Sequence, residues 1–218
     1  MKAMTLTTDN GITFETEVTG AEDATRAVML IHDWWGVLDY NRVWAERLAA
    51  KGYLVMVVDL YDGEHAHDAQ EAGEMMRGLD QEVTDRKLLT ALAWLKGNGR
   101  RVAVLGWSLG GHQALQTTIL EPESVDATVL FYCRLISDPD TLATIQGPVL
   151  AIFAEQERTW PEKMEQFQTL MNGADKQLEV KSYDAGHGFV NPRSARYDEA
   201  ATEDAWNLSV EFLRTALA

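Results

Sequence analysis

Short apolar segments alternate along most of the chain with longer segments in which apolar residues recur at helical spacing. Several of the short segments are continuously apolar, which is typical of parallel strands covered on both faces. The strands expected on this basis are Ala27–Ile31, Tyr53–Val58, Arg101–Leu105, Ala127–Phe131, Val149–Phe153 and Leu178–Tyr183. Ile12–Thr19 instead alternates apolar and polar residues, so we expect it to form an antiparallel edge hairpin with Met4–Thr7.

Helical periodicity fills the intervals between these strands. The expected helices are Asn41–Ala50, Ala69–Met76, Glu82–Lys96, Leu109–Leu120, Pro161–Met171 and Ala195–Ala218. This alternation predicts an α/β protein with a doubly wound, mostly parallel sheet, right-handed crossovers and helices on both faces. No repeat, low-complexity tract or long linker divides residues 1–218, so we expect a single domain.

The chain is strongly acidic, with 19 basic and 34 acidic residues and a formal net charge of −15. A surface of this sign repels nucleic-acid phosphates and anionic membranes, so neither is an expected partner. The segment Met1–Thr8 lacks the apolar centre of a signal peptide, and no later segment has the length of a membrane span. The single cysteine, Cys133, ends an apolar run, so we expect a buried, inert thiol in a cytoplasmic protein.

The segment Gly106–Gly111, with the sequence Gly-Trp-Ser-Leu-Gly-Gly, carries the clearest chemical signal. A Gly-x-Ser-x-Gly pattern between a strand and a helix is typical of the nucleophile turn of serine hydrolases. The turn is so tight that side chains on either side of the serine would clash, which explains the glycines. The helix that follows places its N-terminus behind Ser108, where it can stabilise negative charge.

Polar residues follow four of the expected parallel strands at their carboxyl ends, where sheets of this kind bind ligands. They are His32 with Asp33, Ser108, Glu155 with Glu157, and Asp184 with His187. A serine hydroxyl needs a base to take its proton and a third group to orient that base. The order serine, acid, histidine is the one that α/β hydrolases use, so Ser108 and His187 are the expected nucleophile and base.

The other histidines are weaker candidates for chemistry. His112 lies one turn into the helix after Ser108 and is expected to point away from the serine hydroxyl, whereas His32 is expected to brace the loop after its strand. His65, His67 and Asp68 could together bind a metal, but their spacing matches no established site. We therefore expect no metal site.

Several segments in order along the chain resemble the dienelactone hydrolase family. They are Ile31–Gly36, Arg47–Tyr53 with Val58–Tyr61, Gly106–Gly111, Gly186–Phe189, and Arg196–Ala201 continuing to Trp206. The resemblance runs from about Ala27 to the last residue. It implies an α/β-hydrolase fold without a large cap. It also implies hydrolysis of small esters or lactones through an acyl-enzyme, a mechanism that requires no cofactor.

The sequence departs from the family pattern at the nucleophile and at the acid. Dienelactone hydrolases proper resemble this chain except that they carry a cysteine where Ser108 stands. The family's Gly-x-x-Asp segment aligns with Ala154–Glu157, which makes Glu157 the orienting acid by resemblance. Glu155 and Asp184 remain alternative acids.

The remaining site residues are assigned from this resemblance and from their places beside the strands. Asp33 matches a glutamate that helps to ionise the thiol in cysteine members. A carboxylate alone cannot make an alkoxide, so Asp33 is expected to hold its loop or contact substrate. The backbone N–H groups of Leu109 and Trp34 are the expected oxyanion donors. Trp35 and Trp107 are expected to line the substrate pocket with Asp33, core packing being the alternative for Trp107.

These observations predict a serine hydrolase that cleaves small carboxylic esters or lactones through an acyl-enzyme. Its expected partner is the small-molecule substrate, and the protein is expected to be a monomer or small homo-oligomer. Two alternatives remain open. A non-catalytic binding member would have no carboxylate within hydrogen-bond reach of the His187 ring, whereas an acyl-transfer enzyme would use the same three residues as a hydrolase.

Overall fold

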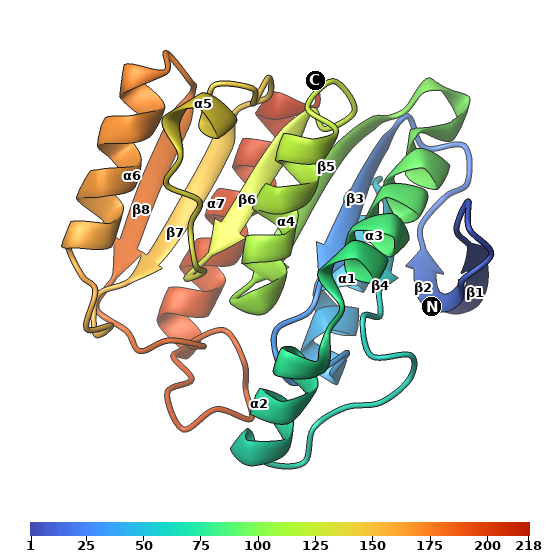
Figure 1. Ribbon diagram of the computed structural model, residues 1–218, viewed down its shortest axis with the longest axis horizontal. Coiled ribbons are helices and arrows are strands. Elements are labelled where there is room, and N and C mark those ends of the chain that lie inside the picture. Colours follow the sequence, from blue (N-terminus) through green and yellow to red (C-terminus); the bar gives the residue numbers. More distant parts are fainter.

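The centre of the computed structural model, which describes residues 1–218, is one eight-stranded sheet (Figure 1). The strands are β1 (Lys2–Thr7), β2 (Thr13–Thr19), β3 (Arg26–Ile31), β4 (Leu54–Val58), β5 (Arg101–Trp107), β6 (Ala127–Phe131), β7 (Val149–Ala154) and β8 (Leu178–Tyr183). They lie in the order β1-β2-β4-β3-β5-β6-β7-β8. β2 is antiparallel to both of its neighbours and all other pairs are parallel. The predicted doubly wound sheet and its antiparallel edge hairpin are confirmed.

Helices cover both faces of this sheet. They are α1 (Asp39–Ala49), α2 (Ala69–Gly78), α3 (Gln81–Lys96), α4 (Leu109–Leu120), α5 (Pro139–Leu142), α6 (Glu162–Gly173) and α7 (Glu199–Ala216). α1 and α7 pack on one face and α3, α4 and α6 on the other, whereas α2 lies beyond the carboxyl ends of the strands (Figure 1). The short helix α5 was not expected. No helix is both long and apolar enough to cross a membrane.

Aspartate caps fix where four of the helices begin. The side chains of Asp68, Asp80, Asp138 and Asp198 each accept a hydrogen bond from a backbone N–H in the first turn. The helix expected at Ala195–Ala218 begins only at Glu199, because Asp198 caps its first turn. The residues before the cap form turns instead, and this segment contributes to the candidate site.

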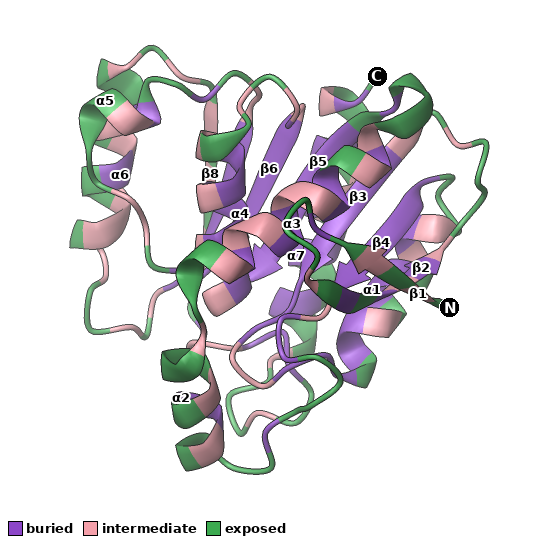
Figure 2. Cartoon of the chain, turned by 45° about the vertical axis from the view of Figure 1, so that its right-hand side comes forward, coloured by how far each residue is buried: buried purple, intermediate pink, exposed green.

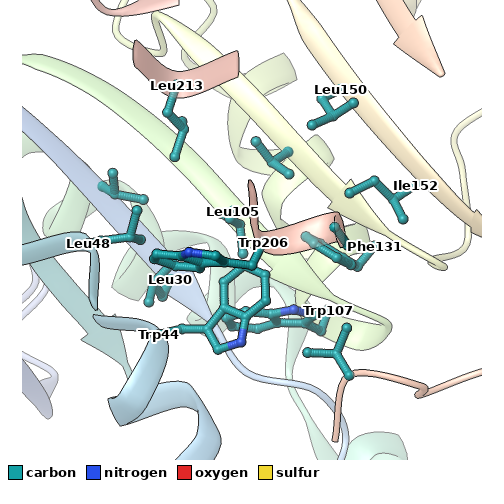
Figure 3. Packing of buried hydrophobic residues seen from close by; sticks show 14 of the residues in the cluster. Leu30, Trp44, Leu48, Leu105, Trp107, Phe131, Leu150, Ile152, Trp206 and Leu213 are labelled. Carbon is teal, nitrogen blue, oxygen red and sulfur yellow. The ribbon is translucent and has the colours of Figure 1, made fainter. Parts of the chain in front are cut away.

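The apolar core forms two layers, one on each side of the sheet. Strands β3 to β7 are buried almost throughout, whereas the edge strand β8 is only partly buried (Figure 2). In the layer beneath α1 and α7, Trp44 packs edge-on against Trp107 and Trp206, with ring centroids 5.3 and 4.9 Å apart (Figure 3). Such edge-to-face pairs contribute about 1 kcal/mol each beyond the area they bury. The three indoles therefore tie α1 and α7 to the carboxyl end of β5.

Cys133 lies in the opposite layer, beneath α4, and is buried as expected. Burial raises the pKa of its thiol to about 12. The thiol therefore stays protonated at neutral pH and packs as a small apolar group.

At the turn from β5 into α4, the helix lies so close to the sheet that no Cβ fits between them. Ser108, at the turn, has a φ of 54°, a region that residues other than glycine seldom adopt. A Cβ at Gly106 would lie 2.0 Å from the Gly110 carbonyl oxygen, and a Cβ at Gly110 would lie 2.1 Å from the Ile31 carbonyl oxygen. Because both obstructions are backbone atoms, only glycine fits at either position.

Replacement of Gly110 by alanine should therefore destabilise the fold, by about 3 kcal/mol or more, because helix and sheet must move apart. Gly78→Ala is the matched control: Gly78 is also helical, but nothing lies within 4 Å of a Cβ there. That change should be neutral or stabilise by up to about 1 kcal/mol. Urea unfolding of both variants measures the difference, and equal midpoints would contradict the packing argument.

Candidate active site

Ser108 stands at the carboxyl end of β5, where the strained turn holds its hydroxyl clear of the sheet. Its backbone N–H donates to the Phe131 carbonyl at 2.9 Å, and its carbonyl accepts from the His112 N–H at 3.1 Å. The residue is thereby fixed on both sides, to β6 and to α4. Its Oγ lies 2.8 Å from Nε2 of His187.

His187 reaches Ser108 from the loop that follows β8. Its ring packs against Tyr132, with centroids 5.0 Å apart, and its side chain is 42% exposed. The opposite ring nitrogen, Nδ1, lies 2.7 Å from Oε1 of Glu157. Since a carboxylate only accepts hydrogen bonds, Nδ1 carries the hydrogen and Nε2 is left to accept from the serine hydroxyl.

Glu157 lies in the loop after β7, with its side chain 12% exposed. The two alternative acids have other partners: Glu155 accepts from the Ser182 hydroxyl at 2.6 Å, and Asp184 accepts from the Gln156 amide at 3.2 Å. Of the three carboxylates considered from the sequence, Glu157 is the one that contacts His187.

Lys163, in the first turn of α6, binds the other carboxylate oxygen of Glu157 through its ammonium group. Burial alone would raise the pKa of Glu157, but the hydrogen bonds from His187 and Lys163 outweigh it and lower the pKa below its ordinary value. The carboxylate therefore remains charged beside the imidazole. Sequence reasoning missed Lys163, because a lysine in an amphipathic helix carries no signal of its partner.

Asp33, after β3, is buried and makes a compact set of hydrogen bonds. Its Oδ1 accepts from the Trp35 N–H and its Oδ2 from the Tyr40 hydroxyl, both at 2.9 Å. Burial is the dominant influence on its pKa, and the hydrogen bonds reverse only part of that effect, which leaves the pKa at about 6. Asp33 thus braces the loop that carries Trp34 and Trp35.

A cavity of about 70 Å³ opens beside Ser108 and His187. The expected pocket residues Asp33 and Trp35 line it, as does Trp34. The structure places Trp107 elsewhere, wholly buried among the core aromatics, because its side chain points to the α1 and α7 face of the sheet. Trp107 therefore packs in the core, the alternative role considered for it, and does not line the pocket.

The expected oxyanion donors belong to residues beside Ser108: Trp34 lines the same cavity, and Leu109 follows Ser108 in the chain. The N–H groups of Trp34 and Leu109 take part in no hydrogen bond within the chain. Gly110 lies against the carbonyls of Ile31 and His32, so the start of α4 and the loop carrying Trp34 are in close contact. Both donors are therefore available near the Ser108 hydroxyl.

The remaining histidines have structural partners. His32 is fully buried, and its ring nitrogens contact the Asp33 carbonyl at 2.6 Å and the Leu60 N–H at 3.0 Å, so it braces two loops. His112, on α4, contacts Arg134 in the segment after β6 through both ring nitrogens. His65 and His67 pack ring to ring, and no three His, Cys, Asp or Glu side chains gather as metal ligands would.

Comparison with known proteins identifies the family. The family model described as "dienelactone hydrolase family" matches residues 14–217. The chain belongs to the dienelactone hydrolase family. It is 28% identical over 213 residues to the carboxymethylenebutenolidase of Rhodococcus opacus, covering 91% of this chain and 83% of that protein. It is 26% identical over 214 residues to protein usf of Aquifex pyrophilus, covering 87% and 88%.

Solved structures show the same fold. A dienelactone hydrolase-like promiscuous phosphotriesterase, P91, from metagenomic libraries superposes with a TM-score of 0.87 at 21% identity, over 100% of this chain and 99% of that one. The dienelactone hydrolase of Anabaena variabilis superposes with a TM-score of 0.77 at 20% identity, over 100% and 98%. This member of the dienelactone hydrolase family therefore has the α/β-hydrolase fold, and it is a hydrolase of the lactone and ester type.

The burial of Asp33 gives a testable pH dependence of stability. Its folded pKa of about 6 lies above the ordinary value of 3.8, so the folded state holds more protons between these values. Stability therefore falls as the pH rises from about 4 to about 6, by about 3 kcal/mol. Asp33→Asn should remove this dependence. Urea unfolding across this range measures it, and a constant free-energy difference between variant and wild type would refute it.

Proposed function

We propose that the protein is a serine hydrolase that cleaves small carboxylic esters or lactones through an acyl-enzyme. The observation that carries the proposal is the continuous hydrogen-bonded chain from Ser108 Oγ through His187 to Glu157, with links of 2.8 and 2.7 Å. Such a chain supplies the base that a serine hydroxyl requires and the acid that orients the base.

In the first half of the reaction, Ser108 Oγ attacks the carbonyl carbon while His187 Nε2 takes its proton. The C=O π bond becomes a C–O⁻ single bond, and the N–H groups of Leu109 and Trp34 stabilise its charge. Collapse of this intermediate breaks the bond to the leaving oxygen, which receives the proton from His187. Glu157 keeps the imidazole oriented and balances its positive charge throughout.

In the second half, water replaces the leaving alcohol. His187 takes a proton from the water, whose oxygen attacks the acyl carbon, and returns it to Ser108 Oγ as the acyl bond breaks. The products are the carboxylic acid and free enzyme. With a lactone the alcohol and acid belong to one molecule, so a single ring-opened product leaves. No cofactor takes part in this scheme.

The main alternative, a non-catalytic binding member, predicts a His187 ring without a carboxylate partner. The Glu157 contact argues against it. An acyl-transfer enzyme would use the same first half-reaction with an alcohol in place of water. Nothing specific in the site favours an acceptor other than water, so hydrolysis is the proposal.

Ser108→Ala should lower kcat/KM toward p-nitrophenyl acetate by about 10⁴-fold or more, because no other hydroxyl contacts His187. The measurement is release of p-nitrophenolate, with circular dichroism to confirm that the variant is folded. Retention of the wild-type rate would refute the proposal. In wild type, rapid quenching followed by mass spectrometry should detect the acyl group on Ser108.

The assignment of the acid can be tested with matched variants. Glu157→Gln should lower kcat by about 10³–10⁴-fold, because the amide cannot balance the imidazolium charge. Glu155→Gln and Asp184→Asn remove equal charge from neighbouring positions that do not contact His187, so their rates should stay within a few fold of wild type. A larger loss in either of them than in Glu157→Gln would reassign the acid.

Lys163 should keep the Glu157 carboxylate charged at low pH. Lys163→Met removes a cation that lowers the pKa of Glu157, so this carboxylate will protonate at a higher pH. Because the imidazole then loses its anionic partner, kcat/KM should fall further on the acid side than in wild type. Lys163→Arg keeps the charge and should leave the profile near that of wild type. Coincident profiles for the Met and Arg variants would contradict this role.

A further inference from the structure

Strand β8 leaves one edge of the sheet open. It is last in the order of strands, and β7 is the only strand beside it (Figure 1). The carbonyl of Gln177, just before β8, accepts from the Val149 N–H of β7 at 2.9 Å, and the Tyr183 carbonyl accepts from the chain after β7 at the same distance. In this parallel pair the odd-numbered residues of β8 therefore direct their backbone groups toward β7. An open edge of this kind can pair with a strand of another chain.

The even-numbered residues Leu178, Val180 and Ser182 direct their backbone groups outward instead. Because these groups are aimed away from β7, none of them is hydrogen-bonded within the chain. The Leu178 and Val180 side chains pack against the core layer beneath α6 and are only partly buried. The edge therefore offers a row of free donors and acceptors beside an apolar surface that the chain does not fully cover.

Glu179 and Lys181 lie on the other face of β8, toward α7, and both are exposed. The Lys181 ammonium is 3.6 Å from the Asp204 carboxylate of α7. Glu179 makes no ion pair within the chain, and it borders a groove that Glu211 and Phe212 of α7 also line. Strand β8 thus carries an unpaired anion and a cation two residues apart on one face.

A second copy of β8 complements this edge when the two strands run antiparallel about a two-fold axis at Val180. The axis sets Val180 opposite itself, and the two residues exchange N–H···O bonds through their outward-facing groups. Glu179 of each copy then lies opposite Lys181 of the other, at a position without backbone hydrogen bonds, where facing side chains are closest. Both charges acquire an opposite partner on the same face of the joined sheet.

Other positions of the axis are excluded by charge or by hydrogen bonding. An axis at Glu179 or at Lys181 would set like charges directly opposite each other, which is destabilising. An axis between two residues would set an outward-facing residue opposite one whose backbone groups already bind β7, so no ladder could form. Charged residues on an edge strand usually discourage pairing. On β8 the order of the two charges permits it in a single register.

We propose that the open edge of β8 is a self-association surface, through which two copies of the protein join their sheets about a two-fold axis at Val180, with Glu179 and Lys181 specifying the register. The partner is a second copy because the strand complements itself in charge as well as in hydrogen bonding. Ser108 and His187 meet within one chain, so the surface is independent of the proposed hydrolase function.

Analytical ultracentrifugation of the wild-type chain gives the first measurement. We expect a dimer, with twice the 24.4 kDa mass of one chain. Each copy has a formal net charge of −15, so the two copies repel each other at long range. The experiment is therefore done at about 150 mM salt, where a Debye length of about 8 Å screens this repulsion.

Two charge reversals and their mixture test the register. Glu179→Lys sets two cations opposite each other at both ends of the pairing, and Lys181→Glu sets two anions there. The Kd of the dimer should therefore rise about tenfold or more in each variant alone. In an equimolar mixture of the two variants every facing pair is again opposite in charge, so the mixed dimer should form with a Kd near that of wild type.

Lys51→Glu is the matched control. It makes the same change of charge at an exposed turn that leads into β4, in the other half of the sheet, and should leave the dimer unchanged. Recovery in the mixture cannot come from misfolded variants, and circular dichroism checks each one. A monomeric wild type, reversals that leave the dimer intact, or a mixture without recovery would overturn the surface, and none of these results bears on ester hydrolysis.

Discussion

The contact between the start of α4 and the carboxyl ends of β3 and β5 is the constraint on which the site depends. Gly110 packs directly on the Ile31 and His32 carbonyls, and Gly106 packs on Gly110. This contact forces Ser108 into its strained conformation and at the same time brings the loop after β3 to the helix N-terminus. The proposed nucleophile, Ser108, and the two proposed oxyanion donors are therefore positioned by one packing arrangement of the backbone.

Two carboxylates lie near the same imidazole, and their surroundings move their pKa values in opposite directions. Glu157 receives hydrogen bonds from His187 and Lys163, which lower its pKa despite burial. Asp33 has no cation in direct contact, so burial dominates and raises its pKa to about 6. The different environments separate their roles: Glu157 stays anionic beside the proposed base, whereas Asp33 holds a loop through neutral donors.

The sequence was sufficient to predict the sheet, Ser108 and His187, whereas Glu157 was assigned by family resemblance, with Glu155 and Asp184 as alternatives. The first part has a geometric reason, because all parallel strands deliver their next residues to one edge, and the order serine, acid, histidine excluded most other pairings. The position of Trp107 could also have been predicted. It alternates in register with Ala103 and Leu105, so its side chain must point into the same core layer as theirs.

Other residues gave no usable signal. Tyr132 follows an apolar strand sequence and was indistinguishable from a core residue, although it lines the cavity and packs against His187. Lys163 lies on a helix whose rotation relative to the β7 loop depends on tertiary packing. Helix α5 is a single turn, too short for periodicity to detect. The positions of Tyr132 and Lys163 were thus set by long-range packing rather than by local pattern.

The hydrogen bonds of Asp33 bear on why a serine can serve at this position. Both oxygens of Asp33 accept hydrogen bonds, from the Trp35 N–H and the Tyr40 hydroxyl, and neither is hydrogen-bonded to Ser108. Even a free carboxylate would be too weak a base for a serine hydroxyl, whose proton must go to an oriented imidazole. The direct contact of Ser108 with His187 meets that requirement without Asp33. Asp33 can therefore be committed entirely to the loop, where its bond to the Trp35 N–H fixes the turn that presents the Trp34 N–H.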